Sequence, residues 1–301
     1  MICKIKISTL LFFISISGFS QQLNLFLKPN DTLHIQRRNT VVISEAAFGA
    51  TALIGLNALW YKDYDRSKFH TINDLNEWMQ MDKVGHAFSS YQLARVGADV
   101  LNWSGVSKKN QLIYGATFGF TFLSAVEILD GFSKEWGFSW SDITANAFGT
   151  GLYIGQELLW EEQRLQLKFS FSQSPYAEKR PERLGNSYLE QLFKDYNGQT
   201  YWLSVNLDAF FKESKFPKWL NIAIGYSANG MLTGKNESVN NMFTSQNQYR
   251  QFFLSFDVNL NKINTKSSVL KTIFSVLNVI KVPLPTFEFN SKNKAVFHLL
   301  H

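Results

Sequence analysis

The spacing of apolar residues changes near Arg164, and this change constrains the fold more than any other feature of the chain. Before Arg164 the apolar residues form runs of helical length, whereas after it they alternate with polar residues over short stretches. Long apolar runs are typical of helices, and a period of two is typical of a strand with one apolar face. The sequence therefore predicts an α+β protein, with an N-terminal apolar helical bundle followed by a small antiparallel β-rich region.

Four helices are expected in the first half of the chain. Gly131 fits the end of the third helix, and Ser141 is a suitable N-cap for the fourth. Asp142 then lies in the first turn of the fourth helix, where the helix dipole favours negative charge. The expected helices cover residues 40–61, 75–101 and 111–130, and a fourth that begins after Ser141.

The first and third of these helices approach the length of a membrane span, which is roughly 20 apolar residues. Both are rich in Gly, Ala, Ser and Thr, and the fourth helix carries Gly-Leu-Tyr-Ile-Gly at positions 151–155. Small residues at this spacing let helices approach closely in a bilayer, and they do the same in a tightly packed bundle in water. Both settings stay open, with a preference for a membrane or membrane lipid as partner.

Five runs in the second half alternate between apolar and polar residues. They lie at residues 165–171, 203–207, 220–224, 252–260 and 287–289, with a helix expected over 268–281 and a polar loop over 233–248. A closed bacterial barrel needs at least about eight strands of roughly nine to eleven residues. The runs therefore predict an antiparallel sheet docked on the helices. Its apolar side chains are expected to meet other protein, namely Leu203, Leu207, Phe252, Phe256 and Leu260.

The N-terminus has the three parts of a secretory signal. Lys4 and Lys6 precede a short apolar stretch, and Gly18 and Ser20 occupy the small-residue positions before a cut at residue 21. The single cysteine, Cys3, lies inside this signal, so the mature chain is expected to hold neither disulfides nor thiolate metal ligands. We expect an exported protein of the periplasm or the outer membrane.

The basic residues are scattered, although the formal net charge is +6. A nucleic-acid-binding protein normally concentrates its basic residues on one face, so no nucleic-acid partner is expected. The predicted organisation is a signal peptide over residues 1–20, a helical domain over 21–163 and a β-rich region over 164–301.

Ionisable residues on the apolar helices mark the candidate site, because burying them costs free energy unless they are paired or used. Asp82 and His86 are four residues apart on the second helix, so they share one face. Asp142 and Asn146 repeat this spacing on the fourth helix. The remaining candidates are Lys83, Glu127 and Asp130.

Two chemistries stay open for this set if the three helices pack with these faces inward. Oxygen ligands and one imidazole suit a divalent cation whose identity the sequence leaves unknown. The same groups suit acid–base catalysis, with His86 oriented by a carboxylate. Each residue taken alone is more often structural, as a first-turn acid, a core histidine or a solvated acid. In the catalytic interpretation His86, Asp82 and Glu127 react, while Lys83, Asp130, Asp142 and Asn146 hold the ligand.

The order of these residues resembles known bacterial families. The pattern is Asp82-Lys83-x-x-His86, then Glu127-x-x-Asp130-Gly131, then Asp142-x-x-x-Asn146-x-x-Gly149. Over about residues 40–160 it resembles the uncharacterised family labelled "predicted periplasmic lipoprotein" and, more distantly, the VanZ-like membrane family. The second half, including residues 196–202, resembles the longer envelope members of the first family. The chain departs from the family label, because no lipoprotein cysteine follows the signal.

The resemblance implies a cell-envelope protein with a shared polar site, and it supplies no reaction. The first functional hypothesis is a membrane-associated, non-enzymatic envelope protein whose site binds a ligand or cation. The second is a membrane-proximal enzyme that acts on a lipid head group or a cell-wall precursor. The sequence has no nucleophile elbow, phosphate loop or zinc-binding HExxH helix to strengthen the second hypothesis.

Overall fold

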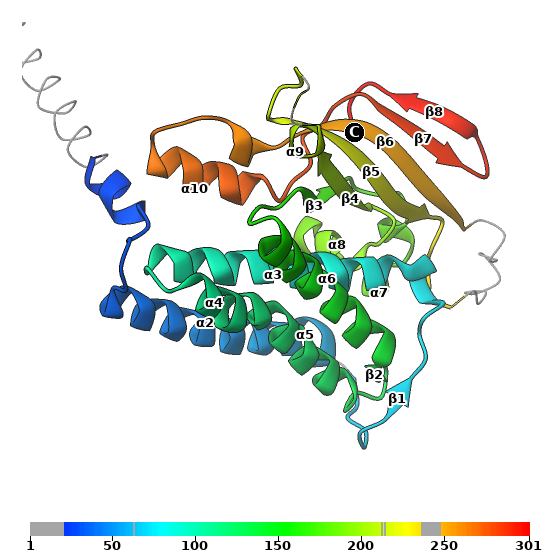
Figure 1. Cartoon of the computed structure of the whole chain (residues 1–301). Helices are drawn as coiled ribbons and strands as arrows, with labels where there is room; N and C mark the ends of the chain where they lie inside the picture. The colour runs from blue at the N-terminus through cyan, green and yellow to red at the C-terminus, as the bar shows by residue number, and fades with distance from the viewer. Residues whose placement is uncertain (1–20, 63, 212, 214, 236–247) are drawn as a thin grey trace, which may run out of the picture.

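The computed structural model describes residues 21–301 except 63, 212, 214 and 236–247. The predicted signal peptide and most of the predicted polar loop therefore lie outside the described residues. Helices fill the first half of the described chain, and a six-stranded antiparallel sheet follows in the second half (Figure 1). This mixed helix-and-sheet class, with its C-terminal antiparallel sheet, confirms the prediction made from the change in apolar spacing.

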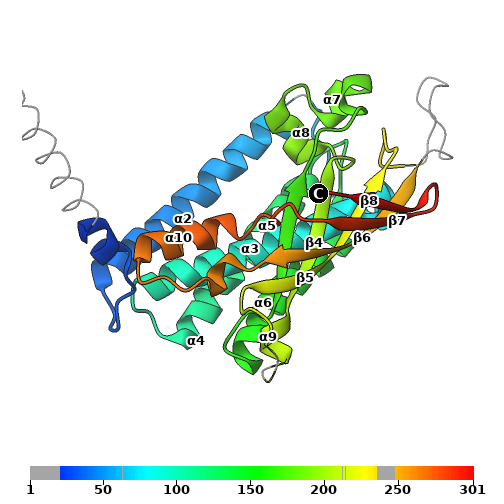
Figure 2. The same cartoon turned by 90° about the horizontal axis from the view of Figure 1, so that it is seen from above.

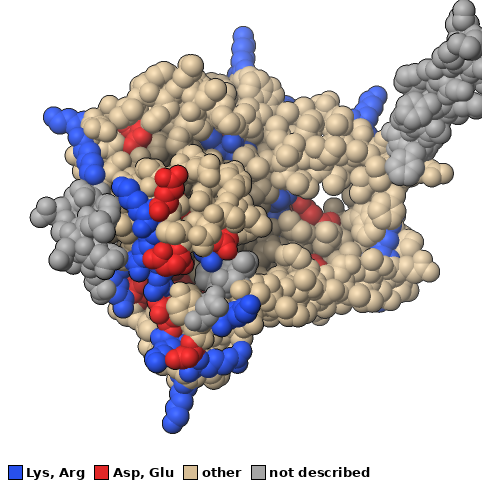
Figure 3. Space-filling view, turned by 180° about the vertical axis from the view of Figure 1, so that it is seen from behind, with Lys and Arg blue, Asp and Glu red and all other residues tan. Residues whose placement is uncertain are grey.

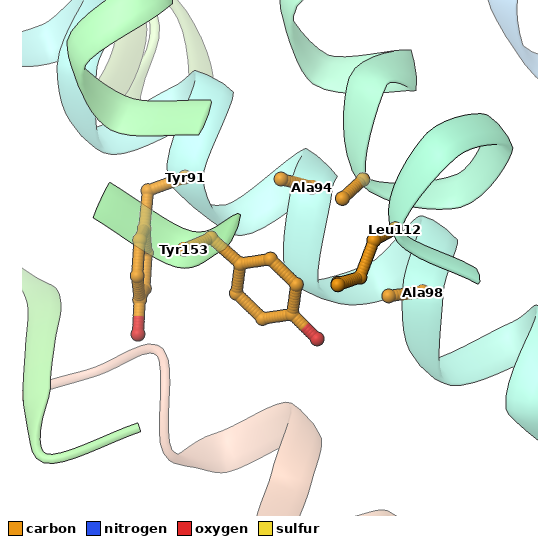
Figure 4. Packing of buried hydrophobic residues seen from close by; sticks show 6 residues of the cluster. Tyr91, Ala94, Ala98, Leu112 and Tyr153 are labelled. Atoms are coloured by element: carbon orange, nitrogen blue, oxygen red, sulfur yellow. The ribbon is translucent and has the colours of Figure 1, made fainter. Parts of the chain in front are cut away.

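The helical half is built around α3 (Met81–Trp103). The helix α6 (Trp140–Leu159) packs along α3, and so does the continuous helical stretch formed by α4 (Lys108–Asn110), the π-helical segment η3 (Gln111–Ala116) and α5 (Thr117–Asp130). Figure 4 shows the apolar centre of this packing, where Tyr91 and Tyr153 meet edge to face at 6.0 Å beside the residues of η3. This core fixes the relative positions of the three helices that carry the candidate site.

The predicted bundle of about four helices is not confirmed. The helix α2 (Ile35–Leu56) continues into the π-helical segment η1 (Asn57–Tyr61) and runs beside the other helices (Figure 2). Val41 is its buried residue, and most of its apolar side chains are exposed. A helix contributes to a bundle core only through the apolar face that it buries, so α2 is a loosely attached neighbour of α3.

The second predicted helix begins later than the sequence suggests. Its expected start was residue 75, but α3 begins at Met81. The three residues before it, Trp78, Met79 and Gln80, have positive φ values of 47°, 52° and 64°. Residues other than glycine rarely adopt this left-handed backbone conformation, and a residue that adopts it cannot be part of a right-handed helix. The break cannot be read from apolar spacing, which continues through it.

The N-cap of α6 is Ser139 and not Ser141. The Ser139 hydroxyl accepts a hydrogen bond from the backbone N–H of Asp142, so it satisfies one of the free donors of the first turn. Ser141 instead donates its hydroxyl proton to Asp74, 2.9 Å away. Asp142 still lies in the first turn of the helix, as predicted.

The close packing of α6 on α3 depends on Gly149. A β-carbon at this position would lie 2.0 Å from the carbonyl oxygen of Ala87 and 2.1 Å from the hydroxyl of Ser90. We expect Gly149→Ala to destabilise the fold by about 1–3 kcal/mol, because the helices must separate. Gly151→Ala is the matched control, since nothing lies within 4 Å of its β-carbon. The control should change stability by no more than about 1 kcal/mol, in the stabilising direction. Thermal unfolding of both variants tests this, and equal effects would contradict it.

The strands of the sheet follow one another in chain order, each antiparallel to its neighbour. The five predicted runs fall in the first five strands, and residues 294–298 add a sixth. Leu207 leaves the sheet and opens a short helix. The strands are β3 (Leu165–Phe171), β4 (Gln199–Asn206), β5 (Leu220–Asn229), β6 (Tyr249–Val258), β7 (Thr286–Asn290) and β8 (Lys294–His298).

Short elements connect this framework. The predicted helix over 268–281 is α10, which ends at Leu277. The others are β1 (Thr71–Ile72), which pairs in parallel with β2 (Phe138–Ser139), η2 (Glu77–Gln80), η4 (Ala177–Lys179), α7 (Pro181–Leu184), α8 (Tyr188–Lys194), α9 (Leu207–Phe210), η6 (Leu260–Lys262) and α10 (Ser268–Leu277).

The prediction that the apolar side of the sheet is covered by protein was wrong for β6. Phe252 and Phe256 are 50% and 53% exposed. The opposite side of the sheet is the buried one, and it holds Lys168 and Asp257 as a fully buried ion pair at 2.7 Å. Buried charges persist when they are paired and hydrogen-bonded, and this pairing lets the polar side of the sheet face inward.

Candidate functional site

The structure brings the predicted site residues together where α3, α5 and α6 meet. Their side chains come from the first turns of α3, the last turn of α5 and the first turns of α6. The tertiary structure adds one acid, Asp74, from the segment that precedes α3. We call these eight residues the acid–histidine cluster: Asp74, Asp82, Lys83, His86, Glu127, Asp130, Asp142 and Asn146.

Lys83 holds one half of the cluster together. Its Nζ lies 2.5 Å from Asp74 Oδ2, 2.9 Å from Asp82 Oδ2 and 2.8 Å from Asp142 Oδ1. The lysine side chain is 10% exposed, so water screens these contacts little. One ammonium group therefore joins carboxylates from the pre-α3 segment, α3 and α6.

These contacts set the pKa values of the three acids. Burial opposes ionisation of Asp74, yet hydrogen bonds from Lys83 and Ser139 lower its pKa. Burial also opposes ionisation of Asp82, and the charges of His86 and Lys83 lower its pKa. Asp142 is less well compensated, because burial and the charge of Asp82 raise its pKa to about 6. The lysine alone does not balance the acids around it.

His86 faces the other half of the cluster. Its Nδ1 lies 3.0 Å from the side-chain oxygen of Asn146, which accepts the ring proton. Its Nε2 lies 3.5 Å from Glu127 Oε1 and 3.8 Å from Asp82 Oδ1. With Nδ1 directed at the amide oxygen, Nε2 points at two carboxyl groups. This arrangement is favourable only with a proton or a cation between the nitrogen and the oxygens.

Glu127 and Asp130 carry the excess acidity. Glu127 is 2% exposed, and burial together with the charges of Asp142 and Asp130 raises its pKa to about 10. Burial raises the pKa of Asp130 to about 7, although a 2.6 Å hydrogen bond from the Tyr61 hydroxyl opposes the shift. At neutral pH Glu127 therefore keeps its proton unless another cation replaces it.

The cluster borders two cavities. His86, Glu127 and Asp130 line a cavity of about 500 Å³ that apolar side chains of α2, α5 and α8 help to enclose. A larger apolar groove of about 1160 Å³ lies between the sheet and helices α3 and α6, with Lys83 in its wall. Ile72, Phe88 and Tyr201 line both spaces. The polar groups thus have access to a ligand-sized space on one side and to an apolar groove on the other.

The sequence pattern missed several partners of the cluster. A change in backbone conformation separates Asp74 from α3, so helical spacing gives no signal for this residue. Tyr196 donates a 2.6 Å hydrogen bond to Asp82 from more than a hundred residues away in the chain. The only sequence signal that pointed to Tyr196 was the resemblance of residues 196–202 to the longer envelope members of the first family. Tyr61 and Ser139 reach the cluster only through tertiary contacts.

The segment that carries the cluster resembles one known protein family. No curated protein and no solved structure matches the chain. A family model does match, and it supports the first of the two resemblances predicted from the sequence. The predicted localisation, an exported protein of the periplasm or the outer membrane, agrees with it: residues 73–155, which contain all eight residues of the acid–histidine cluster, match the family described as "Predicted periplasmic lipoprotein (DUF2279)".

Proposed function

We propose that this chain is a cell-envelope protein whose acid–histidine cluster binds one divalent cation. The observation that carries the proposal is a ligand set from two helices: Asp82, His86 and Asp142 offer donor atoms that all lie within 4.8 Å of one another. Glu127 adds an oxygen 3.5 Å from the same imidazole nitrogen. The spacings of 3.5 Å and 3.8 Å from His86 Nε2 to Glu127 and Asp82 suit one ion, because two ligand atoms that each lie roughly 2.0–2.2 Å from an ion can be up to about 4 Å apart.

The charges of the cluster also favour a cation. Five carboxyl groups surround one lysine and one histidine, and two of these acids have pKa values raised to about 7 and about 10. Lys83 binds Asp82 through Oδ2, which leaves Oδ1 directed toward His86 and Tyr196. A divalent ion beside Oδ1 would therefore neutralise the excess acid without displacing the lysine.

Asn146 completes the site as the group that orients the imidazole. Histidine ligands commonly donate their second ring N–H to such a partner, and this fixes the tautomer that binds metal. Asn146 is fully buried, and its amide nitrogen has no hydrogen-bond partner among the described residues. A mixed imidazole and carboxylate set suits Zn²⁺ or Mn²⁺.

We propose further that the helical part contacts a membrane. Two helices are long and apolar enough to cross one by length and composition, Ile35–Leu56 and Lys108–Asp130. The first is almost entirely exposed, which favours α2 as the contacting helix. The second packs on α3 and carries Glu127 into the cluster. The division into a helical domain over 21–163 and a β-rich region over 164–301, and the distant likeness to the VanZ-like family, stay predictions.

A calorimetric titration of the full chain in detergent micelles, after treatment with a chelator, tests the cation site. We expect Zn²⁺ or Mn²⁺ to bind with one ion per chain. Glu127→Gln should weaken the affinity by about tenfold or more, since it removes an anionic ligand. The matched control is Glu135→Gln, because Glu135 pairs with Arg183 outside the cluster. Absence of stoichiometric binding for both ions, or equal losses in the two variants, would overturn the proposal.

The alternative is a membrane-proximal enzyme acting on a lipid head group or a cell-wall precursor. One observation favours it: His86 and Glu127 line the same 500 Å³ cavity. Burial raises the pKa of Glu127 to about 10, so a protonated acid lies 3.5 Å from the imidazole Nε2 of His86. Such a pair suits general acid–base catalysis. Product analysis after incubation with phospholipid or lipid-linked cell-wall precursor distinguishes this alternative from binding alone.

A further inference from the structure

The sheet presents a continuous apolar surface. Residues in register across the strands form one apolar row, from Leu203 on β4 through Ile224, Leu254 and Phe287 to Phe297 on β8. The last four side chains are 46–55% exposed. In a water-soluble antiparallel sheet the apolar side faces the core and the polar side faces water, so this sheet has the reverse polarity.

The polar groups on the inner side of the sheet are paired with one another, so the fold itself stabilises the reversed polarity. Asp257 forms an ion pair with Lys168 and accepts a 2.6 Å hydrogen bond from the Ser204 hydroxyl. Asn221 donates to Ser204, and Asn206 donates to Asn221. A satisfied inner network with an apolar outer side is the pattern of sheets that face lipid. Hydrocarbon is therefore the environment that matches the outer side.

Part of this apolar side forms one wall of the 1160 Å³ groove. The sheet contributes Leu203, Ile224 and Phe252, α3 contributes Phe88, and α6 contributes Trp140 and Phe148. The groove is larger than the roughly 300–1,000 Å³ of pockets for drug-sized ligands. It therefore has room for a long apolar ligand.

The chemistry of the wall identifies the ligand class. A peptide in the groove would need hydrogen-bond partners for its backbone, because unpaired polar groups cost free energy when buried. The groove walls are mainly apolar side chains, and a hydrocarbon chain needs no such partners. Lys83 and the residues shared with the smaller cavity connect the groove to the acid–histidine cluster.

The surface charge is consistent with a lipid environment. In Figure 3 the acidic and basic side chains gather mainly at one end of the face shown, and wide areas of the rest carry no charge. Apolar side chains are also exposed on α2 and α6, including Ile43, Phe48 and Phe148.

We propose that the groove between the sheet and α6 binds one acyl chain of a bilayer phospholipid, with the phosphate end directed toward the acid–histidine cluster. The acyl chain lies against the apolar row of the sheet. The orientation of the phosphate rests on the proposed cation site, since a bound divalent cation would attract it. The acyl site itself depends only on the groove.

A photolabelling experiment with a matched pair of variants tests this site. The probe is a phosphatidylcholine with a diazirine near the end of one acyl chain, incorporated into nanodiscs with the full chain. We expect labels on the groove residues Trp140, Phe148 and Phe252. Ala145→Trp should fill the groove and reduce this labelling at least about fivefold, because the added ring takes the space of the acyl chain. Ala145 lines the groove, whereas Ala147 on the same helix is exposed and does not line it.

The control variant, Ala147→Trp, should label like the unchanged protein, and both variants should keep the cation affinity. Labels spread evenly over α2 and the sheet, unaffected by Ala145→Trp, would overturn the acyl site and indicate only general lipid contact. Dimers that cover the groove would overturn it in favour of a second copy of the chain. Loss of cation binding with intact labelling would contradict the proposed function and leave the acyl site standing.

Discussion

Replacing Lys83 by methionine is expected to destabilise the folded chain by about 3–5 kcal/mol near neutral pH. The lysine is the shared cation for Asp74, Asp82 and Asp142, at distances of 2.5–2.9 Å. Methionine keeps much of the length of the side chain but leaves the three carboxyl groups without a positive charge beside them. Chemical denaturation in detergent micelles, followed by tryptophan fluorescence, measures the loss.

The pH dependence separates this electrostatic effect from a packing defect. Lys83 contributes to lowering the pKa values of Asp74 and Asp82, so their contribution to stability is present above the unfolded-state value of about 3.9. That contribution is lost as the pH falls through the lower folded-state values. The stability difference between the variant and the unchanged protein should therefore shrink toward acid pH. A difference that stays constant with pH would indicate a packing defect.

Lys134→Met is the matched control for this prediction. Lys134 also pairs with an aspartate, Asp65, at 3.4 Å, but their side chains are 71% and 81% exposed. Exposed pairs contribute little, because water screens the charges and the flexible side chains lose entropy. We expect the control to change stability by no more than about 0.5 kcal/mol. Equal losses in the two variants would contradict the role assigned to Lys83.

Replacing His86 by alanine is expected to lower the affinity for the divalent cation by at least about 100-fold. The variant removes the imidazole nitrogen that lies 3.5 Å from Glu127 and 3.8 Å from Asp82. Asn146→Ala removes only the partner of the ring Nδ1, so its loss should be smaller, roughly tenfold. Calorimetric titration or competition with a metal indicator measures both affinities.

His34→Ala provides the control for loss of a histidine. His34 is exposed and caps the N-terminus of α2, so it lies on an element that contributes nothing to the cluster. Its removal should leave the cation affinity unchanged, even if the capping loss costs about 1 kcal/mol of stability. Equal affinities in all three variants would show that the ion binds elsewhere.

Helical spacing predicted the part of the candidate site that lies on single helices. A separation of four residues puts two side chains on one face wherever the helix is placed. Asp82 with His86, and Asp142 with Asn146, could therefore be paired before any tertiary structure was available. The same rule could not find Asp74, because positive φ values at residues 78–80 place it outside the helix that carries Asp82.

Alternation predicted the strands but not the side of the sheet that is buried. A period of two predicts that the two sides of the sheet differ in polarity. Phe252 and Phe253, which are neighbours in the chain, do lie on opposite sides. Which side turns inward depends on whether buried polar groups find partners. Lys168 and Asp257, one on β3 and the other on β6, meet only after the strands have paired. The apolar side of β6 consequently stays exposed.

The sequence by itself determined the elements and their faces, because backbone periodicity is a local property of the chain. It determined that helices precede an antiparallel sheet, and that two acid-bearing faces lie on the helices of Asp82 and Asp142. Only the tertiary structure decided that Lys83 pairs with Asp74, that Tyr196 donates to Asp82, and that the sheet turns its charges inward. Those outcomes depend on distances between segments far apart in the chain, and local spacing carries no information about them.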